Sequence, residues 1–145
     1  MIYFDTSGAL VKKYISEIGT DKVRALLNKE KRIFSSKITY AEVCASFARK
    51  HRDNEIEKRH YQRIWRSFIN DWEAIILIEV QEELFPLIRR LVESYPLRGA
   101  DAIHLSSAIW IGEKIGQSLT FAASDNALLS AARNEGLVVI NPEDD

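Results

Sequence analysis

The sequence predicts an α/β fold in which a mostly parallel sheet carries helices on both faces. Short apolar runs alternate with longer stretches of helical periodicity along the whole chain. No repeat, low-complexity tract or linker rich in Gly, Pro or Ser interrupts this alternation. Parallel strands joined by helices require right-handed crossovers, which place helices on both sides of the sheet. At 145 residues we expect a single domain, 1–145, with one substantial core.

Five short runs are the predicted strands. The first opens the chain as Ile2-Tyr3-Phe4. The third, from Ala74 to Val80, is rich in β-branched residues and is shorter than a typical helix. The predicted strands span residues 2–4, 32–36, 74–80, 118–123 and 137–140.

Helices are predicted between these strands. The segment from Thr39 to Glu42 matches the capping box, in which a Glu side chain bonds back to the cap residue. Gly116 and Gly136 are placed to end two of the helices. The predicted helices span residues 7–17, 20–29, 39–51, 54–72, 81–95, 99–116 and 125–135.

One aromatic stripe runs down the helix predicted over 54–72. Its members are Tyr61, Trp65, Phe68 and Trp72, at helical spacing. Core packing explains such a stripe, and so does a groove or a dimer face, since aromatic residues are enriched at protein interfaces. The sequence leaves these alternatives open.

Composition excludes several classes of protein. The net charge of −1 does not indicate a nucleic-acid binder, although seven Lys or Arg and only three acids lie between Arg49 and Arg66. Such a stretch is either a solvated helical face or a contact for a phosphate backbone. The single cysteine, Cys44, excludes an internal disulfide and a multi-cysteine zinc site. No apolar run approaches the roughly 20 residues of a membrane span, and we expect a soluble, cytoplasmic protein.

Four acidic residues stand at the starts of predicted helices: Asp5, Glu42, Asp101 and Asp125. Each has a simple explanation as a helix cap or a partner of the helix dipole. However, Ser, Thr and Asn cap about as well as Asp, and here acids recur. The carboxyl ends of parallel strands open on one edge, where ligands bind. We therefore expect these acids to meet there.

Clustered carboxylates raise each other's pKa and destabilise a fold unless a cation neutralises them. Hard oxygen ligands suit Mg²⁺ or Mn²⁺ rather than zinc. We therefore expect Asp5, Asp101 and Asp125 to hold one or two divalent ions, and Glu42 to bind through water or to orient the nucleophile. We expect a structural role for His104, one turn after Asp101; support of an acid and contact with the substrate are the alternatives.

Four segments of the chain resemble PIN domains, in particular the VapC-type toxins of toxin–antitoxin pairs. They are Ile2–Val11, Thr39–Val43, Leu97–Ala108 and Ala123–Ala132, and they occur in the family's order over nearly the whole chain. The resemblance implies a three-layer α/β/α sandwich with a central parallel sheet of about five strands. It also implies a Mg²⁺- or Mn²⁺-dependent ribonuclease that leaves 5′-phosphate and 3′-hydroxyl ends. By position, Asp5, Glu42, Asp101 and Asp125 match the family's acidic quartet.

The resemblance further implies supporting residues and partners. Thr6 or Ser7 matches a hydroxyl that supports the first acid, whereas Ala123 stands where the family often has Thr or Ser, leaving Ser124 to support Asp125. An antitoxin whose C-terminal segment lies in an apolar groove and an RNA substrate are expected, as is a homodimer. Five cations are candidates for gripping the RNA backbone: Lys12, Lys13, Arg49, Arg52 and Arg98.

Three other functions compete with this interpretation. A haloacid-dehalogenase-type phosphatase needs a second Asp two residues after the first, where this chain has Ser7. A larger DNA 5′-nuclease needs DNA-clamping elements for which 145 residues leave no room. A non-catalytic PIN-like module that binds RNA or protein has no reason to keep four acids together. The nuclease is therefore the preferred prediction.

Overall fold

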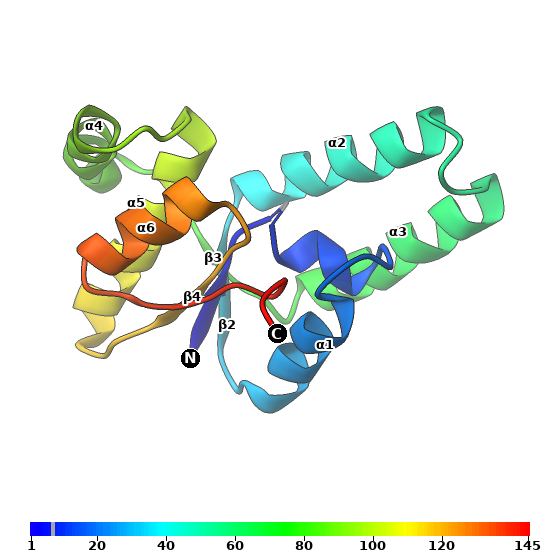
Figure 1. Ribbon diagram of the computed structural model, residues 1–145, viewed down its shortest axis with the longest axis horizontal. Coiled ribbons are helices and arrows are strands. Elements are labelled where there is room, and N and C mark those ends of the chain that lie inside the picture. The colour runs from blue at the N-terminus through cyan, green and yellow to red at the C-terminus, as the bar shows by residue number, and fades with distance from the viewer. Residues whose placement is uncertain (7) are drawn as a thin grey trace.

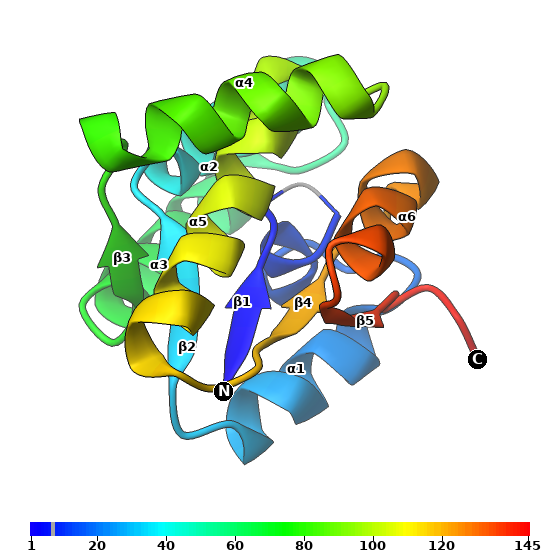
Figure 2. The same ribbon diagram turned by 90° about the vertical axis from the view of Figure 1, so that its left-hand side faces the viewer.

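Five parallel strands form one sheet in the computed structural model, which describes residues 1–6 and 8–145 (Figures 1 and 2). The strands lie in the order β3-β2-β1-β4-β5, so the first strand of the chain is central. Their bounds are β1 Ile2–Phe4, β2 Ile33–Ser36, β3 Ile76–Ile78, β4 Thr120–Ala122 and β5 Val138–Ile140. This arrangement confirms the predicted parallel α/β sheet.

Helices cover both faces of the sheet and complete a three-layer sandwich (Figures 1 and 2). The α-helices are α1 Thr20–Lys29, α2 Ile38–Arg52, α3 Lys58–Trp72, α4 Phe85–Ser94, α5 Gly99–Ile115 and α6 Asn126–Asn134. Two 3-10 helices, η1 Leu10–Lys13 and η2 Glu82–Leu84, precede α1 and α4. None of the helices in the described ranges is long and apolar enough to cross a membrane.

Alternate residues of β1 face two separate cores. Tyr3 packs with the cluster of α4, α5 and α6. Ile2 and Phe4 pack with the cluster of η1, α1, α2 and α3. All three side chains are fully buried, because a central strand of a parallel sheet is covered on both sides.

The aromatic stripe of α3 belongs partly to the second core. Phe68 is fully buried, whereas Tyr61, Trp65 and Trp72 are half-buried and pack against that core. Phe47 and Tyr14 contact the Phe68 ring edge-on. Core packing therefore explains one side of the stripe, and the other side reaches the surface.

Two predicted helices and the predicted capping box differ in the structure. The helix expected over 7–17 is only the short η1, because the N–H groups of Leu10 and Val11 bond to the carbonyls of Asp5 and Thr6 in wide turns. The helix expected over 81–95 starts with η2 before α4 begins. The capping box is wrong because α2 begins at Ile38, and Thr39 already lies inside the helix.

Gly8 lets the loop after β1 approach the loop after β4. A Cβ atom at Gly8 would lie 2.5 Å from the backbone nitrogen of Ser124, and the Ser124 hydroxyl donates a hydrogen bond to the Gly8 carbonyl.

We expect Gly8→Ala to lower the free energy of unfolding by about 1–3 kcal/mol, because the backbone must shift to admit the methyl group. Urea unfolding measures this loss. Gly99→Ala is the matched control, because a Cβ there meets nothing within 4 Å. Equal stability of Gly8→Ala and wild type would contradict the prediction.

Glu135, at the end of α6, joins that helix to α4. Arg90 donates two hydrogen bonds to its carboxylate, at 2.9 and 2.6 Å, and Tyr95 donates a third. The bonds from Arg90 hold the pKa of Glu135 below its ordinary value, against the raising effect of burial, and the bond from Tyr95 adds a smaller lowering effect. Because the folded-state pKa of Glu135 is lowered, its bonds stabilise the fold above the unfolded pKa of about 4.3. This stabilisation is lost as pH falls through the folded-state pKa.

We expect Glu135→Gln to lower the free energy of unfolding at pH 7 by about 0.5–1 kcal/mol, since solvent around Arg90 screens part of the attraction. The difference from wild type should shrink below about pH 4, where the carboxylate becomes protonated. Thermal unfolding of the variant and of wild type at pH 7 and below about pH 4 measures this difference in stability. Glu93→Gln, which breaks the exposed pair with Arg89, should cost less. A deficit for Glu135→Gln that stays constant with pH would refute the ion-pair explanation.

Candidate functional site

Four acids reach the carboxyl edge of the sheet from different elements. Asp5 directly follows β1, and Asp125 is the N-cap of α6, three residues after β4. Glu42 projects from α2, and Asp101 lies in the first turn of α5. Asp5 and Asp101 are buried, Glu42 is half-buried and Asp125 is exposed. The acids thus line a site that is buried on one side and open on the other.

Backbone contacts hold Asp5 beside the loop of Asp125. The N–H of Asp5 donates to the carbonyl of Ala122 at 2.9 Å, which continues the β1–β4 pairing. The N–H of Gly8 donates to Asp5 Oδ2 at 3.2 Å, so Asp5 supports a turn and does not cap a helix as expected. The close contact of Gly8 with Ser124 then joins the two loops. Ser124 therefore supports the loop of Asp125 through the backbone.

The buried side chain of His104 contacts two of the acids, Asp5 and Glu42, from the protein interior. Its ring is fully buried, with Nε2 2.6 Å from Glu42 Oε1 and 3.6 Å from Asp5 Oδ1. Nδ1 lies 3.0 Å from the hydroxyl of Tyr3 on β1. One imidazole on α5 therefore links the central strand, α2 and two of the predicted site acids.

A chain of hydroxyl groups holds Glu42 from the other side. Thr6 Oγ1 lies 2.9 Å from both Glu42 Oε1 and Thr39 Oγ1, and 3.2 Å from His104 Nε2. Thr39 Oγ1 lies 2.7 Å from the hydroxyl of Ser35, which donates to the carbonyl of Phe4. The Thr6 hydroxyl therefore bonds to Glu42, whereas the resemblance implied that it supports the first acid, Asp5. Ser7, the alternative, lies outside the described residues.

Asp101 and Asp125 both take part in the capping of helices. Asp101 Oδ2 accepts hydrogen bonds from the backbone N–H and from Nε of Arg98, both at 3.2 Å. Asp125 Oδ1 accepts the N–H of Leu128 at 2.8 Å. The capping explanation is therefore confirmed for these two acids. Because each cap uses one carboxylate oxygen, it leaves the other oxygen for a ligand.

The charges of the site are coupled. Burial raises the pKa of Asp5 above its ordinary value; the charge of His104 lowers it, and that of Glu42 raises it further. Burial also acts to raise the pKa of Glu42, but the hydrogen bond and charge of His104 outweigh it, and the net shift is downward. The pKa of His104 is raised, because the bond to Glu42 and the charges of Asp5 and Glu42 outweigh its burial. The imidazole and the two carboxylates therefore shift one another's pKa.

Arg98 lies at the exposed rim of the site and bonds to Asp101. Its Nε bonds to Asp101, while the charges of Asp101, Asp125 and Asp5 raise the pKa of the guanidinium. The guanidinium charge in turn contributes to the lowered pKa of Glu42. The Arg98 side chain is 79% exposed, so it is free to turn toward a ligand at the site.

The donor set fits a hard divalent cation by its chemistry. In the described part of the chain, Asp5, Glu42, Asp101 and Asp125 each have one carboxylate oxygen that accepts no hydrogen bond. Carboxylate oxygens are the ligands that Mg²⁺ and Mn²⁺ prefer. Across residues 1–6 and 8–145, no three His, Cys, Asp or Glu side chains are already arranged to hold a metal ion.

The other predicted cations lie away from the acids or are already paired. Lys12 is buried, and its ammonium group bonds to Glu143 and Glu17, so it is unsuited to gripping RNA. Lys13 pairs with Asp71 at 2.6 Å. Arg49 and Arg52 are exposed, about 10 and 15 Å further along α2 than Glu42.

Sequence reasoning missed the network beneath the acids. His104 was expected to be structural, without its contact to Glu42. In the sequence, Tyr3 and Ser35 are ordinary residues of predicted strands, and Thr39 is the cap residue of a predicted helix. The only available signal was the spacing of Asp101 and His104, three residues apart and hence on one face of a helix.

Comparisons with known proteins identify relatives of this chain. The family model described as PIN domain matches residues 2–134. Ribonuclease VapC45 and Ribonuclease VapC49 come from two strains of Mycobacterium tuberculosis, CDC 1551 / Oshkosh and ATCC 25618 / H37Rv. Each is 33% identical over 139 residues, which cover 94% of this chain and 92% of the relative.

Solved structures share the fold. The crystal structure of FitAcB from Neisseria gonorrhoeae has a TM-score of 0.66 at 17% identity, covering 98% of each chain. The structure of FitAB bound to an IR36 DNA fragment has a TM-score of 0.65 at 18% identity, covering 100% of this chain and 97% of the other. Both agree with the parallel sheet and helical layers described above. Together with the family match and the 33% identical relatives, they lead to one conclusion: this chain belongs to the PIN domain family.

Proposed function

We propose that this protein is a Mg²⁺- or Mn²⁺-dependent endoribonuclease that leaves 5′-phosphate and 3′-hydroxyl ends. The supporting observation is the group of four carboxylates at one sheet edge, two of them buried and with Asp5 and Glu42 joined through His104. Buried like charges destabilise a protein unless a cation neutralises them. Such a group of carboxylates is therefore typical of a functional site. The relatives named Ribonuclease VapC support RNA as the substrate and a role as the toxin of a toxin–antitoxin pair.

Asp5, Asp101 and Asp125 are the proposed metal ligands. Each has an oxygen left over after its local hydrogen bond, and together they offer only hard oxygen donors. When bound, a divalent ion acidifies a water molecule and offsets charge that develops on the phosphate.

Glu42 and Arg98 have separate proposed tasks. The lowered pKa of Glu42 keeps it a carboxylate, so it can bind a metal ion through water or orient the attacking water. Thr6 and His104 hold it in place. Arg98 is exposed at the rim, where its guanidinium can donate to phosphate oxygens.

The proposal includes two protein partners, a cognate antitoxin and a second copy of this chain. A cognate antitoxin would place a cationic side chain, such as Arg, against the acids and compete with the metal ion. A homodimer is proposed from the family resemblance alone.

Asp5→Asn and Asp101→Asn should each abolish metal-dependent RNA cleavage. Residues that only support a metal ligand change affinity or activity by about 10- to 100-fold, so replacing a ligand should cost about a hundredfold or more. The measurement is cleavage of total cellular RNA by purified protein with Mg²⁺, Mn²⁺ or EDTA, with the cut ends mapped. Asp21→Asn, an exposed acid in the first turn of α1, is the matched control and should cleave like wild type.

Calorimetric titration with Mn²⁺ gives a second readout that does not depend on activity. Wild type and Asp21→Asn should bind the ion, and the two site variants should bind it much more weakly. If all four proteins gave the same background cleavage while wild type was folded and bound Mn²⁺, catalysis would be rejected. A non-catalytic RNA- or protein-binding module would then be the better description.

His104→Phe should destabilise the protein by about 2–3 kcal/mol. The phenyl ring fills the space, but Glu42, Thr6 and Tyr3 lose a buried hydrogen-bond partner, and an unmade buried bond costs about 1–3 kcal/mol. Urea unfolding is the measurement. Tyr3→Phe removes one of these bonds and should cost about 1 kcal/mol. A His104→Phe variant no less stable than Tyr3→Phe would show that the imidazole does not hold the network.

A further inference from the structure

The ammonium group of Lys12 lies inside the protein, where the proposed chemistry does not use it. The side chain, on η1, is only 5% exposed, and its Nζ lies 2.8 Å from Glu143 Oε1 and 3.4 Å from Glu17 Oε1. Lysine is almost never buried unless it is paired, because its charge loses contact with water. Glu143, at the shorter distance, is therefore the main partner that allows Lys12 to be buried.

Glu143 belongs to residues 141–145, a segment that follows β5. Figure 1 shows this segment beside α1. Lys22 of α1 donates hydrogen bonds to the carbonyls of Asn141 and Asp144, at 3.2 and 3.0 Å. The N–H of Glu143 donates to Asn141 Oδ1 at 2.9 Å. The segment is thus bonded to α1 through its backbone and to η1 through the Glu143 side chain.

Close packing accompanies these bonds. Pro142 is buried, and it lies directly against Gly19, the N-cap of α1. A Cβ atom at Gly19 would lie 2.7 Å from the Pro142 carbonyl oxygen, and the φ of +90° at Gly19 also favours glycine. Residues 141–145 are therefore seated on the start of α1 without a gap.

η1 in turn holds the loop of the first acid. The N–H of Leu10 donates to the carbonyl of Asp5, and the N–H of Val11 donates to the carbonyl of Thr6, both at 3.0 Å. Asp5 supplies a carboxylate to the site, and the Thr6 hydroxyl bonds to Glu42. A displacement of η1 would therefore move two residues of the site together.

η1 cannot keep this position by itself. It has only four residues in 3-10 geometry, and no side chain caps its start at Ala9. Isolated helices shorter than about 12 residues are marginal in water. Leu10 and Val11 pack in the second core, but apolar contacts have little directionality. The ion pair of Lys12 adds a directional contact that sets where η1 lies.

We propose that Lys12 and Glu143 are positioning residues for Asp5. Through their ion pair, residues 141–145 hold η1, and η1 fixes the backbone of Asp5 and Thr6 at the edge of the sheet. Both residues act through η1 and not on the substrate. This inference rests on the proposed function, because it concerns the first acid of that site.

Hydrogen exchange of the Leu10 and Val11 amides, followed by NMR on the full chain, tests the positioning without using activity. Glu143→Gln should speed their exchange by about tenfold to a hundredfold, since a hydrogen bond to a charged group contributes about that much to a local opening equilibrium. Calorimetric titration with Mn²⁺ is the second readout. Affinity should fall about tenfold, the lower end of the effect of residues that support a metal ligand.

Lys12→Met separates positioning from simple filling of space. Methionine matches the length of the lysine stem and buries no charge, and Glu143 is 43% exposed, so water can solvate its freed carboxylate. The variant should therefore fold even if Glu143→Gln does not. A merely structural role would be satisfied by Met, whereas a positioning role predicts the same faster exchange and weaker Mn²⁺ binding.

Glu135→Gln is the control for a loss of stability elsewhere. It makes the same chemical change in an ion pair that joins α6 to α4. Leu10 and Val11 should exchange at wild-type rates in this variant, because their amides open locally and not with the whole fold. Its Mn²⁺ affinity should also equal that of wild type.

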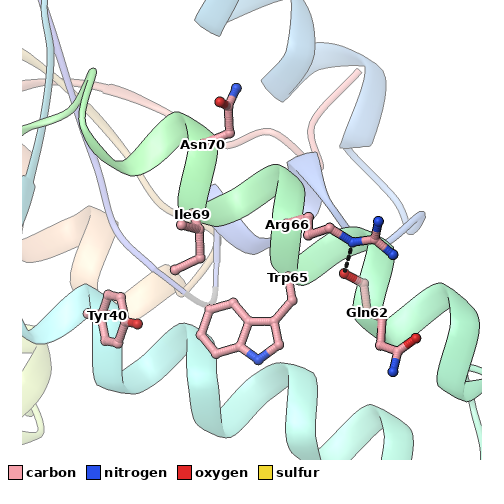
Figure 3. Close-up of a pocket in the computed structure, with 6 residues that line it drawn as sticks. All are labelled: Tyr40, Gln62, Trp65, Arg66, Ile69 and Asn70. Atoms are coloured by element: carbon pink, nitrogen blue, oxygen red, sulfur yellow. Dashed lines mark hydrogen bonds between the residues drawn. The ribbon is translucent and has the colours of Figure 1, made fainter.

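A second control lies at the hollow between α2 and α3, which has a volume of about 770 Å³ (Figure 3). Tyr40 and Trp65 line it together with the exposed Gln62. Among the described residues, none that lines the hollow belongs to η1 or to residues 141–145. Gln62→Ala should therefore leave both the exchange rates and the Mn²⁺ affinity unchanged.

Three results would overturn the positioning role. One is wild-type exchange of Leu10 and Val11 in both Glu143→Gln and Lys12→Met. Another is equally fast exchange in Glu135→Gln, which would describe a general loss of stability. The third is faster exchange with wild-type Mn²⁺ affinity, which would show that η1 moves without moving Asp5. A wild type that neither binds Mn²⁺ nor cleaves RNA would instead reject the proposed function, and the exchange rates would still decide whether the pair holds the loop of Asp5.

Discussion

A buried imidazole joins the layers of this protein at its functional edge. His104 Nε2 on α5 lies 2.6 Å from Glu42 of α2, with Asp5 and Thr6 within 3.6 Å of the same nitrogen, and Nδ1 lies 3.0 Å from the Tyr3 hydroxyl of β1. Burial of a charged ring is costly unless it is paired and hydrogen-bonded on both nitrogens. The two carboxylates and the hydroxyls satisfy that condition, and in return the ring holds them in place.

The parallel sheet explains why the acids are together at all. β1 and β4 are hydrogen-bonded neighbours, so the loops that leave their carboxyl ends run side by side. Gly8 then permits backbone contact with Ser124 and brings the loops of Asp5 and Asp125 together. Asp125 caps α6, and Asp101 bonds to the N–H and Nε of Arg98 at the start of α5, so each carboxylate is stabilised at this edge by its own helix.

One turn of α2 contributes side chains to two different surfaces. Glu42 points toward the buried network of Thr6 and His104, and Tyr40 points toward the hollow shared with α3. Behind Tyr40, Phe47 and Phe68 pack in the second core. The same packing that anchors the helix pair to the sheet therefore fixes the position of both surfaces relative to each other.

Local sequence determined the parts of this protein that depend on neighbouring residues. The alternation of short apolar runs and helical periodicity predicted the parallel α/β class, and the acids at helix starts identified Asp101 and Asp125 as caps. Only the tertiary structure decided the rest. It replaced the expected capping box with a bond from Thr6 to Glu42, and it buried Lys12 against Glu143 at the other end of the chain. It also brought His104 between acids 62 and 99 residues away, because long-range partners depend on how strands and helices stack and not on the spacing along the chain.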